Sequence, residues 1–326
     1  MTSGPYLFLF ASLAATMTMT EALSTVPKKV VVSGAGGQTG KALFRQLLED
    51  EDFDPVGLVR TEASKESLVE DNSYDTAKLI VCDVTDNTAV EAALDWSNVD
   101  ALCICTSGTP GPTGEMTEEG RPVFGFPEGG DPEIVDWIGQ KQQIDAMVNG
   151  ATASSASIKQ IVICSSMGGT DPSNALNTFG RKTDPETGQE TGGNILLWKR
   201  KSEKYLIEQA TAAGDSNFKY TIVHPGGLIN EAGGQRELIV GVDDDRVNYG
   251  GEDSPRTVPR EDVARVMLEA CRTGNVDVYG NRSFDLRAHE PVANDSDEAS
   301  SVDTDFSKLL DSLEGKNCDY SLGKSM

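Results

Sequence analysis

Short apolar runs alternate along the chain with amphipathic segments of helical length. The runs are rich in valine, isoleucine and leucine and predict buried strands. The longer segments repeat apolar residues every three or four positions; in residues 41–50, Leu43, Phe44, Leu47 and Leu48 fall on one face of a predicted helix. The predicted strands are residues 28–34, 54–60, 77–83, 99–105, 159–165, 219–225 and 282–286, with a further apolar run at 236–241. Strands alternating with helices in this way predict βαβ units and an α/β fold with a doubly wound parallel sheet.

The helical segments and the connections between them predict one domain over residues 28–326, with small C-terminal additions. Residues 108–130 and 180–193 are irregular and are interpreted as insertions without structure of their own, and residues 289–303 as an acidic linker. The predicted helices are residues 41–50, 88–96, 132–150, a segment around Lys199, residues 260–271 and a final helix at 304–314.

Residues 1–27 resemble a signal or targeting segment. The stretch "YLFLFASLAATMTM" is uncharged and apolar, too short to span a bilayer but suited to a signal-peptide core, and Thr20-x-Ala22 follows it as a small-residue cleavage pattern. The first residues lack Lys or Arg, which counts against this interpretation. We expect a plastid location reached through the secretory route, with cytoplasmic or secreted locations as alternatives, and no membrane span in the mature chain.

The charge balance restricts the partners of the protein. With 28 basic and 52 acidic residues the formal net charge is −24, so that a polyphosphate backbone would be repelled and nucleic-acid binding is not expected. A site for a small anionic ligand must therefore supply its own local positive charge. A protein partner is left open.

The cysteines favour free thiols over disulfides or a metal site. Cys82, Cys103, Cys105 and Cys164 all lie in predicted buried strands, where cysteine packs as a small hydrophobic residue. The chain has two histidines, far apart in sequence, and no Cys-x-x-Cys pair, so that the usual spacings of metal ligands are missing and no metal is expected.

A glycine-rich turn follows the first predicted strand. In "SGAGGQTGK", Gly34, Gly37 and Gly40 are spaced G-x-x-G-x-x-G between a strand and a helix. Glycines in this setting allow a tight turn and a close backbone approach, so that backbone N–H groups and the helix N-terminus can bind a pyrophosphate. The turn predicts a dinucleotide site formed by Gly34, Gly36, Gly37, Gln38, Thr39 and Gly40.

The end of the second predicted strand indicates which dinucleotide is bound. An acidic residue there would favour the ribose hydroxyls of NAD, whereas "GLVR" places Arg60 at this point. A guanidinium can form paired hydrogen bonds with the 2′-phosphate of NADP, so we expect NADP(H) and consider NAD less favoured. The alternative is a surface arginine paired with Glu62 or Glu66.

Further candidate contact residues end the next two predicted strands, at the sheet edge where ligands of such folds bind. Asp83 and Val84 end the third strand and are suited to contact adenine, and Thr106 and Ser107 follow the fourth and can line the pyrophosphate and ribose. Each pair alone is compatible with ordinary turn chemistry.

These motifs, together with "VDWIGQKQQIDA", "SSMGGTDP", "LLWKRKSEKYL", "GGLINEAGGQRELIVG" and "TVPREDVA", resemble plant-type NADP-binding members of the atypical short-chain dehydrogenase/reductase (SDR) family. The resemblance runs from about Lys28 to the predicted final helix and implies a Rossmann fold. It also implies that Ser165 or Ser166 occupies the place of the catalytic serine, that Lys199 binds the nicotinamide ribose, and that Pro225 and Gly226 form the turn beside the nicotinamide.

The tyrosine that usually precedes the catalytic lysine is missing. Typical SDR enzymes carry Tyr-x-x-x-Lys on one helix face, but the residue four positions before Lys199 is Ile195, which cannot transfer protons. The same spacing at Tyr74 and at Tyr320 falls outside the expected helix.

Two functions stay open. One is an NADP-dependent oxidoreductase of unknown substrate in which Ser166, His224, water or the substrate handles the proton, with Ser166 and Lys199 as the candidate catalytic residues. For His224 a structural role, with the ring bonded to backbone, is the favoured interpretation. The other is a non-catalytic NADP(H) redox sensor or partner-docking protein.

Overall fold

The computed structural model describes residues 26–72, 74–117, 119–153, 158–214, 217–291 and 301–323. The predicted targeting segment at 1–27 and most of the acidic linker at 289–303 therefore lie outside the described residues. Within them, eight strands form the central sheet: β1 (Lys28–Ser33), β2 (Phe53–Val59), β3 (Leu79–Val81), β4 (Ala101–Ile104), β7 (Lys159–Cys164), β10 (Phe218–Pro225), β12 (Leu238–Gly241) and β14 (Arg282–Ala288).

The order across this sheet is β12-β14-β10-β7-β4-β1-β2-β3. All neighbouring strands are parallel except β12, which pairs with β14 in the antiparallel direction at one edge. Reading outward from β1, the order reverses between β1 and β4, as at the switch point of a Rossmann fold. The predicted doubly wound sheet is confirmed, with one antiparallel strand added.

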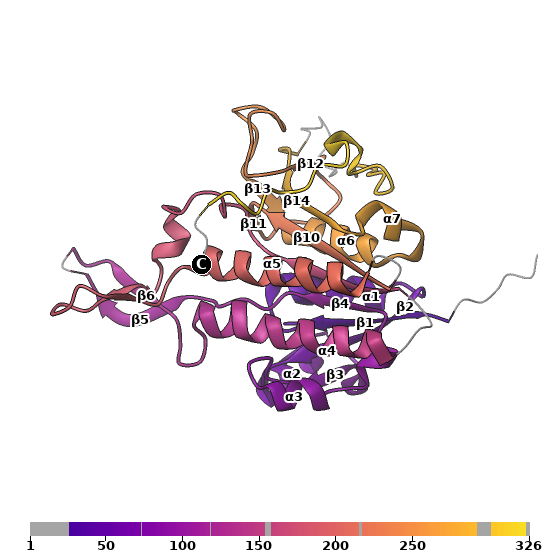
Figure 1. The fold of residues 1–326 in the computed structure, drawn as a ribbon, viewed down its shortest axis with the longest axis horizontal. Coiled ribbons are helices and arrows are strands. Elements are labelled where there is room, and N and C mark those ends of the chain that lie inside the picture. The colour runs from indigo at the N-terminus through magenta and orange to yellow at the C-terminus, as the bar shows by residue number, and fades with distance from the viewer. Residues whose placement is uncertain are drawn as a thin grey trace, which may run out of the picture.

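Helices cover both faces of the sheet (Figure 1). One layer contains α1 (Gln38–Leu48) and α6 (Arg260–Cys271), and the other contains α3 (Asn87–Ala92), α4 (Gln140–Ala153) and α5 (Ile195–Ala213). Alternate residues of each strand enter the two cores: Val30 and Val32 of β1 pack with α1, whereas Val31 joins the core under α4 and α5. The unbroken valine run reflects burial on both faces.

The connections contain more structure than the sequence indicated. Residues 108–130 were expected to be irregular, but β5 (Gly111–Met116) and β6 (Pro122–Gly125) pair as an antiparallel hairpin. A second, smaller hairpin, formed by β8 (Lys182–Thr183) and β9 (Glu190–Thr191), lies in the segment 180–193. Both hairpins project from the same end of the molecule in Figure 1. Their strands are mostly exposed, so no apolar alternation marked them in the sequence.

Further short elements complete the described chain. They are α2 (Glu62–Asn72), β11 (Gly227–Ile229), β13 (Thr257–Pro259), α7 (Val276–Tyr279), and the short helices η1 (Thr76–Lys78), η2 (Trp96–Asn98), η3 (Glu133–Gly139), η4 (Ala175–Thr178), η5 (Thr273–Asn275) and η6 (Asp311–Leu313). Of these, η3 is a π-helix that leads directly into α4, so the predicted helix at 132–150 exists but begins with wider turns.

The predicted final helix at 304–314 is wrong. Residues 306–310 form turns, and only the single 3₁₀ turn η6 follows. The Tyr279 hydroxyl donates a 2.8 Å hydrogen bond to the Phe306 carbonyl oxygen, while Leu310 and Leu313 are both buried, so that contacts with the domain decide this backbone. Glu314 then turns into the left-handed region at φ 49°.

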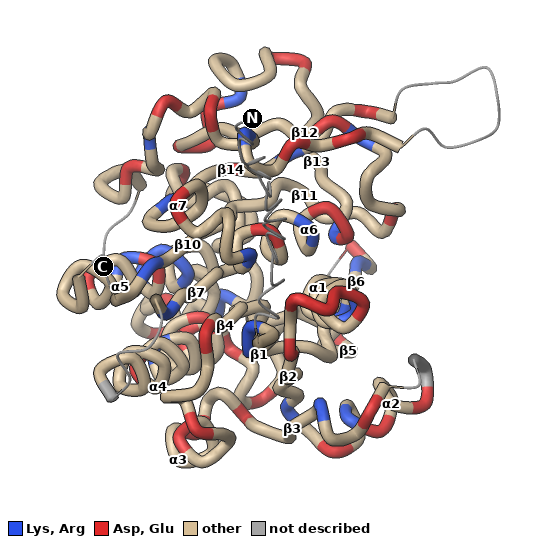
Figure 2. Tube along the Cα trace, turned by 90° about the vertical axis from the view of Figure 1, so that its right-hand side faces the viewer, with Lys and Arg blue, Asp and Glu red and all other residues tan. Residues whose placement is uncertain are grey.

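Acidic residues are spread over many elements of the molecule (Figure 2). All six cysteines are free thiols, as the strand positions of four of them predicted. Across the described residues, no helix is both long enough and apolar enough to span a bilayer.

Candidate functional site

The glycine-rich turn between β1 and α1 is built to receive an anion. Gly34 has a φ of +73° and its carbonyl oxygen accepts a hydrogen bond from the Gly37 N–H at 2.9 Å. Gly37 is the N-cap of α1 and offers no side-chain hydrogen bond, so the first N–H groups of the helix are not capped by it. Positive φ, open N–H groups and the helix dipole together suit a phosphate group.

A cavity of about 830 Å³ runs from this turn across the carboxyl ends of the strands. Its volume is in the range of small-molecule and cofactor sites. The sequence-predicted residues that line it are Gly34, Gly36, Gly37, Gln38, Thr39, Arg60, Asp83, Val84, Thr106, Ser107, Ser165, Ser166 and Lys199. The fold therefore brings the predicted pyrophosphate, adenine, ribose and catalytic positions to one continuous cavity.

Three predicted residues lie beside the cavity without lining it. Gly40 packs beneath the turn, where an added Cβ would lie 2.2 Å from the Gly34 carbonyl oxygen. Pro225 accepts a 3.0 Å hydrogen bond from the Met167 N–H and so supports the loop after β7. Gly226 lies against the Arg256 carbonyl oxygen, 2.3 Å from the position of a Cβ. These three residues shape the walls rather than touch the cavity.

Arg60 lies at the rim of the cavity, directly after β2. It is exposed and, among the described residues, it has no ion pair with Glu62, Glu66 or any other acid. Ser64, from the first turn of α2, lines the cavity beside it, and its backbone N–H donates a 3.1 Å hydrogen bond to the Thr61 hydroxyl. An unpaired guanidinium next to a helix N-terminus is an arrangement that suits a phosphate.

The adenine and ribose walls are held by local hydrogen bonds. The Asp83 carboxylate accepts hydrogen bonds from the backbone N–H and hydroxyl of Thr85, at 3.0 and 2.7 Å, which fixes the turn after β3. On the other wall, the Thr106 carbonyl oxygen accepts a 3.3 Å hydrogen bond from Gln140. The Gln143 amide nitrogen lies 3.5 Å from the Thr106 hydroxyl. Sequence reasoning missed these two glutamines, which reach the wall from α4.

Lys199, on the second turn of α5, forms a buried ion pair with Asp136 of η3. The Lys199 Nζ lies 2.8 Å from Asp136 Oδ1, and Asp136 Oδ2 accepts a 2.8 Å hydrogen bond from the Gly108 N–H. Burial on its own would lower the pKa of Lys199, but Asp136 outweighs it and raises that pKa above its usual value. Lys199 thus keeps its charge at the cavity wall.

The two serines after β7 differ in their partners. The Ser166 hydroxyl donates to the neighbouring Met167 carbonyl oxygen at 3.0 Å. The Ser165 hydroxyl donates to Glu203 of α5, whose second oxygen lies 3.0 Å from His224 Nε2. His224 is buried and does not line the cavity. The sequence favoured a backbone partner for this ring, but its partners are side chains.

The His224–Glu203 contact is strongly polarised. Burial would lower the pKa of His224, but Glu203 raises it well above its usual value. Burial would raise the pKa of Glu203, but His224 lowers it to about 2. The structure therefore places a histidine–carboxylate pair behind Ser165, with Glu203 one hydrogen bond away from the cavity wall.

Ile195 lines the cavity at the position where a tyrosine would stand. No tyrosine or histidine is found among the described residues that line it. Tyr74, which is followed by a lysine four positions later, lies outside the cavity lining and packs edge-to-face against Phe44. Leu228, from β11, also lines the cavity with an apolar side chain, and the sequence did not single it out.

A family model described as NAD(P)H-binding matches residues 34–273. The match covers most of the chain, including the glycine-rich turn and Lys199. The chain therefore belongs to this NAD(P)H-binding family, and its sheet has the strand order of a Rossmann fold.

Two plant proteins are similar to this chain over most of its length. An uncharacterized chloroplastic protein of Arabidopsis thaliana is 40% identical over 272 residues, which cover 82% of this chain and 73% of that protein. Sanguinarine reductase of Eschscholzia californica is 40% identical over 277 residues, which cover 79% of this chain and 88% of that protein. The solved structure of ChuY, an anaerobilin reductase of Escherichia coli O157:H7, is similar in fold, with a TM-score of 0.50, 17% identity and coverage of 82% of this chain and all of that chain.

Proposed function

We propose that this protein binds NADP(H) in the cavity and is an NADP-dependent reductase that works without a catalytic tyrosine. The observation that carries the cofactor assignment is Arg60, which lines the cavity at the end of β2 and has no ion-pair partner among the described residues. An acid at this point would favour the ribose hydroxyls of NAD, whereas a guanidinium favours a 2′-phosphate.

The charge of the cavity supports the same assignment. A protein with a formal net charge of −24 repels an anionic dinucleotide at long range, so that binding needs local cations. Arg60, Lys199 and Arg260 line the cavity at separate points. In the bound complex Arg60 and the Ser64 hydroxyl would contact the 2′-phosphate, the turn from Gly34 to Gly37 the pyrophosphate, and Lys199 the nicotinamide ribose.

The bound cofactor would supply the hydride, and the protein would supply position and charge. Because no phenol or imidazole lines the described cavity, Ser166, water or the substrate would supply the proton for a reduced carbonyl in this proposal. Ser166 lines the cavity, and its hydroxyl donates to the neighbouring Met167 carbonyl oxygen rather than to an acid. The relative named as a reductase supports an oxidoreductase.

A second candidate is a non-catalytic NADP(H) sensor or partner-docking protein, and Ile195 at the tyrosine position favours it. In that case Lys199 holds the cofactor and no proton is transferred.

We also propose a plastid location, because two relatives from Arabidopsis thaliana carry the word chloroplastic in their names.

Turnover separates the two candidates. The purified full chain is incubated with NADPH and a panel of quinones, ketones and cationic heteroaromatic compounds, and NADPH oxidation is followed by absorbance. A reductase oxidises NADPH with at least one acceptor faster than the same mixture does without protein. Both Ser166→Ala and Lys199→Ala then lower this rate. A sensor binds NADPH tightly and gives no turnover above that of free cofactor with any acceptor, and this outcome would reject the reductase.

A further inference from the structure

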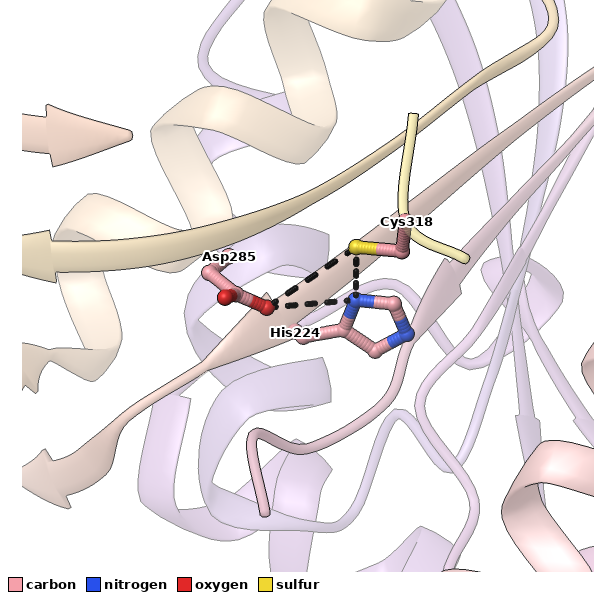
Figure 3. A group of neighbouring side chains, drawn as sticks. All are labelled: His224, Asp285 and Cys318. Carbon is pink, nitrogen blue, oxygen red and sulfur yellow. Dashed lines mark hydrogen bonds and ion pairs between the residues drawn. The ribbon is translucent and has the colours of Figure 1, made fainter. Parts of the chain in front are cut away.

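Three side chains from distant parts of the sequence meet behind the cofactor cavity (Figure 3). His224 and Asp285 are register partners on the parallel strands β10 and β14, and Cys318 comes from the C-terminal strap, which we define as residues 316–323. The His224 Nδ1 lies 3.5 Å from the Cys318 sulfur and 3.6 Å from Asp285 Oδ1, and the sulfur lies 4.0 Å from the same oxygen. All three residues are buried.

These separations fit the ligand shell of a zinc ion. Zinc binds a thiolate at about 2.3 Å and imidazole or carboxylate at about 2.0–2.2 Å, so donor atoms in a tetrahedral site lie about 3.3–3.6 Å apart. Two of the three observed separations agree with this range, and the third is a few tenths of an ångström wider. The mixture of nitrogen, sulfur and oxygen donors is one that zinc accepts, and a fourth position stays for water.

The surroundings of the ligands are those of a metal-binding histidine. Glu203 contacts His224 Nε2 at 3.0 Å, which directs the Nδ1 lone pair toward the cysteine and aspartate when the ring is neutral. The other Asp285 oxygen accepts a 2.7 Å hydrogen bond from the Asp244 N–H, so that one oxygen is left for an ion. Carboxylate partners that orient a histidine ligand in this way are typical of zinc sites.

We propose that His224, Asp285 and Cys318 bind one Zn²⁺ ion, with Glu203 as the residue that positions the histidine. Zinc takes the thiolate and a free imidazole lone pair, so binding releases the thiol proton of Cys318 and any proton on His224 Nδ1, and forms Zn–S and Zn–N bonds beside the Zn–O bond of Asp285.

The proposed ion would tie the C-terminal strap to the sheet. The strap is already held by a hydrogen bond from the Cys318 N–H to the Ser283 hydroxyl at 3.0 Å and one from Arg200 to the Asp319 carbonyl oxygen at 2.8 Å. Opening of the strap gives the metal a way in, because Cys318 leaves with it. Glu203 connects the site to Ser165 at the cavity wall, so metal occupancy would also set the position of that serine. The zinc site does not depend on the proposed reductase function.

Metal content and cobalt spectroscopy test the site. The full chain is stripped with a chelator and titrated with Zn²⁺ and, in parallel, with Co²⁺. We expect one equivalent of either ion to bind, and the cobalt form to show the near-ultraviolet charge-transfer band of a thiolate ligand. Cys318→Ser should lose this band, and Glu203→Gln should weaken zinc affinity about 10- to 100-fold. His289→Ala, which removes the other histidine, should keep both the band and the affinity.

A measurement on the unaltered chain guards against a folding defect in the variants. Zinc should slow alkylation of Cys318 at least tenfold, as read by peptide mass spectrometry, while the rate at the buried Cys271 does not change. Absence of a thiolate band together with equal alkylation of Cys318 with and without zinc would overturn the proposal and leave a metal-free hydrogen-bonded cluster.

Discussion

The Lys199 ammonium lies 2.8 Å from the Asp136 carboxylate, and both side chains are almost completely buried. The contact joins α5 to the π-helical turn η3, and Asp136 in turn accepts a hydrogen bond from Gly108 at the edge of the cavity. The lysine that would hold the nicotinamide ribose is therefore positioned by the protein itself, without a tyrosine.

Removal of one member of this ion pair is expected to destabilise the fold. Lys199→Ala leaves the Asp136 carboxylate buried without its cation, which costs about 3–5 kcal/mol in the free energy of unfolding. Denaturant unfolding of the cofactor-free chain measures this difference. Lys204→Ala, on the same helix and less buried, is the matched control and should cost less than about 0.5 kcal/mol.

A double variant separates the charge effect from lost packing. When Asp136→Asn is added to Lys199→Ala, no charge is left unpaired, so part of the lost stability should return. Equal costs for Lys199→Ala and Lys204→Ala would contradict the account of this ion pair.

The close packing of Gly40 beneath the glycine-rich turn leaves no room for a side chain at this position. Gly40→Ala brings a Cβ to 2.2 Å from the Gly34 carbonyl oxygen, so either α1 or the turn has to move. We expect a loss of about 1–3 kcal/mol in the free energy of unfolding and weaker nucleotide binding. Gly36→Ala is the control for stability, because the nearest atom to its added Cβ is 3.8 Å away. Equal nucleotide affinity of Gly40→Ala and the unaltered chain, measured by calorimetry, would show that the tight packing under the turn is not needed for binding.

The missing phenol can be put back. Ile195→Tyr places a hydroxyl at the cavity wall one helical turn before Lys199, where it can donate the proton that a reduced ketone needs. We expect ketone reduction with NADPH to rise at least about tenfold, since positioned proton donors contribute about 10²- to 10⁴-fold. Ile195→Phe, which has the ring without the hydroxyl, should give no increase. A similar gain in both variants would assign the effect to ring size and not to proton transfer.

Most of the fold could be predicted because the strands and core helices carry strong patterns. The valine run of β1 and the apolar stripe of α1 are local signals of burial, and the turn between them is fixed by its glycines. The helix α2 has no such stripe, because Leu68 is its one buried apolar residue among those described. The sequence pattern therefore did not predict this helix. The last predicted helix failed because long-range contacts of this segment, such as the hydrogen bond from Tyr279 to the Phe306 carbonyl oxygen, are not visible in its local pattern.

Site residues marked by local sequence signals could likewise be predicted, whereas those that depend on long-range contacts could not. Residues at strand ends, such as Arg60 and Thr106, could be assigned to the cavity because the parallel sheet brings its carboxyl edges together. Asp136 could not, because its partner Lys199 is 63 positions away and nothing local distinguishes that aspartate from the other acids. The partners of His224 were hidden for the same reason, since Cys318 is 94 residues further along the chain.

Isothermal titration of NADPH and NADH into the full chain and into Arg60→Ala tests the central claim most directly. We expect NADPH to bind the unaltered chain more tightly than NADH, and Arg60→Ala to weaken NADPH about 10- to 100-fold, because hydrogen bonds to charged groups contribute about 1.5–3 kcal/mol. NADH affinity should change less than about twofold, and Arg121→Ala on the exposed hairpin should change neither. Equal affinity for the two cofactors, or NADPH binding that is indifferent to Arg60→Ala, would contradict the assignment of NADP(H) to this cavity.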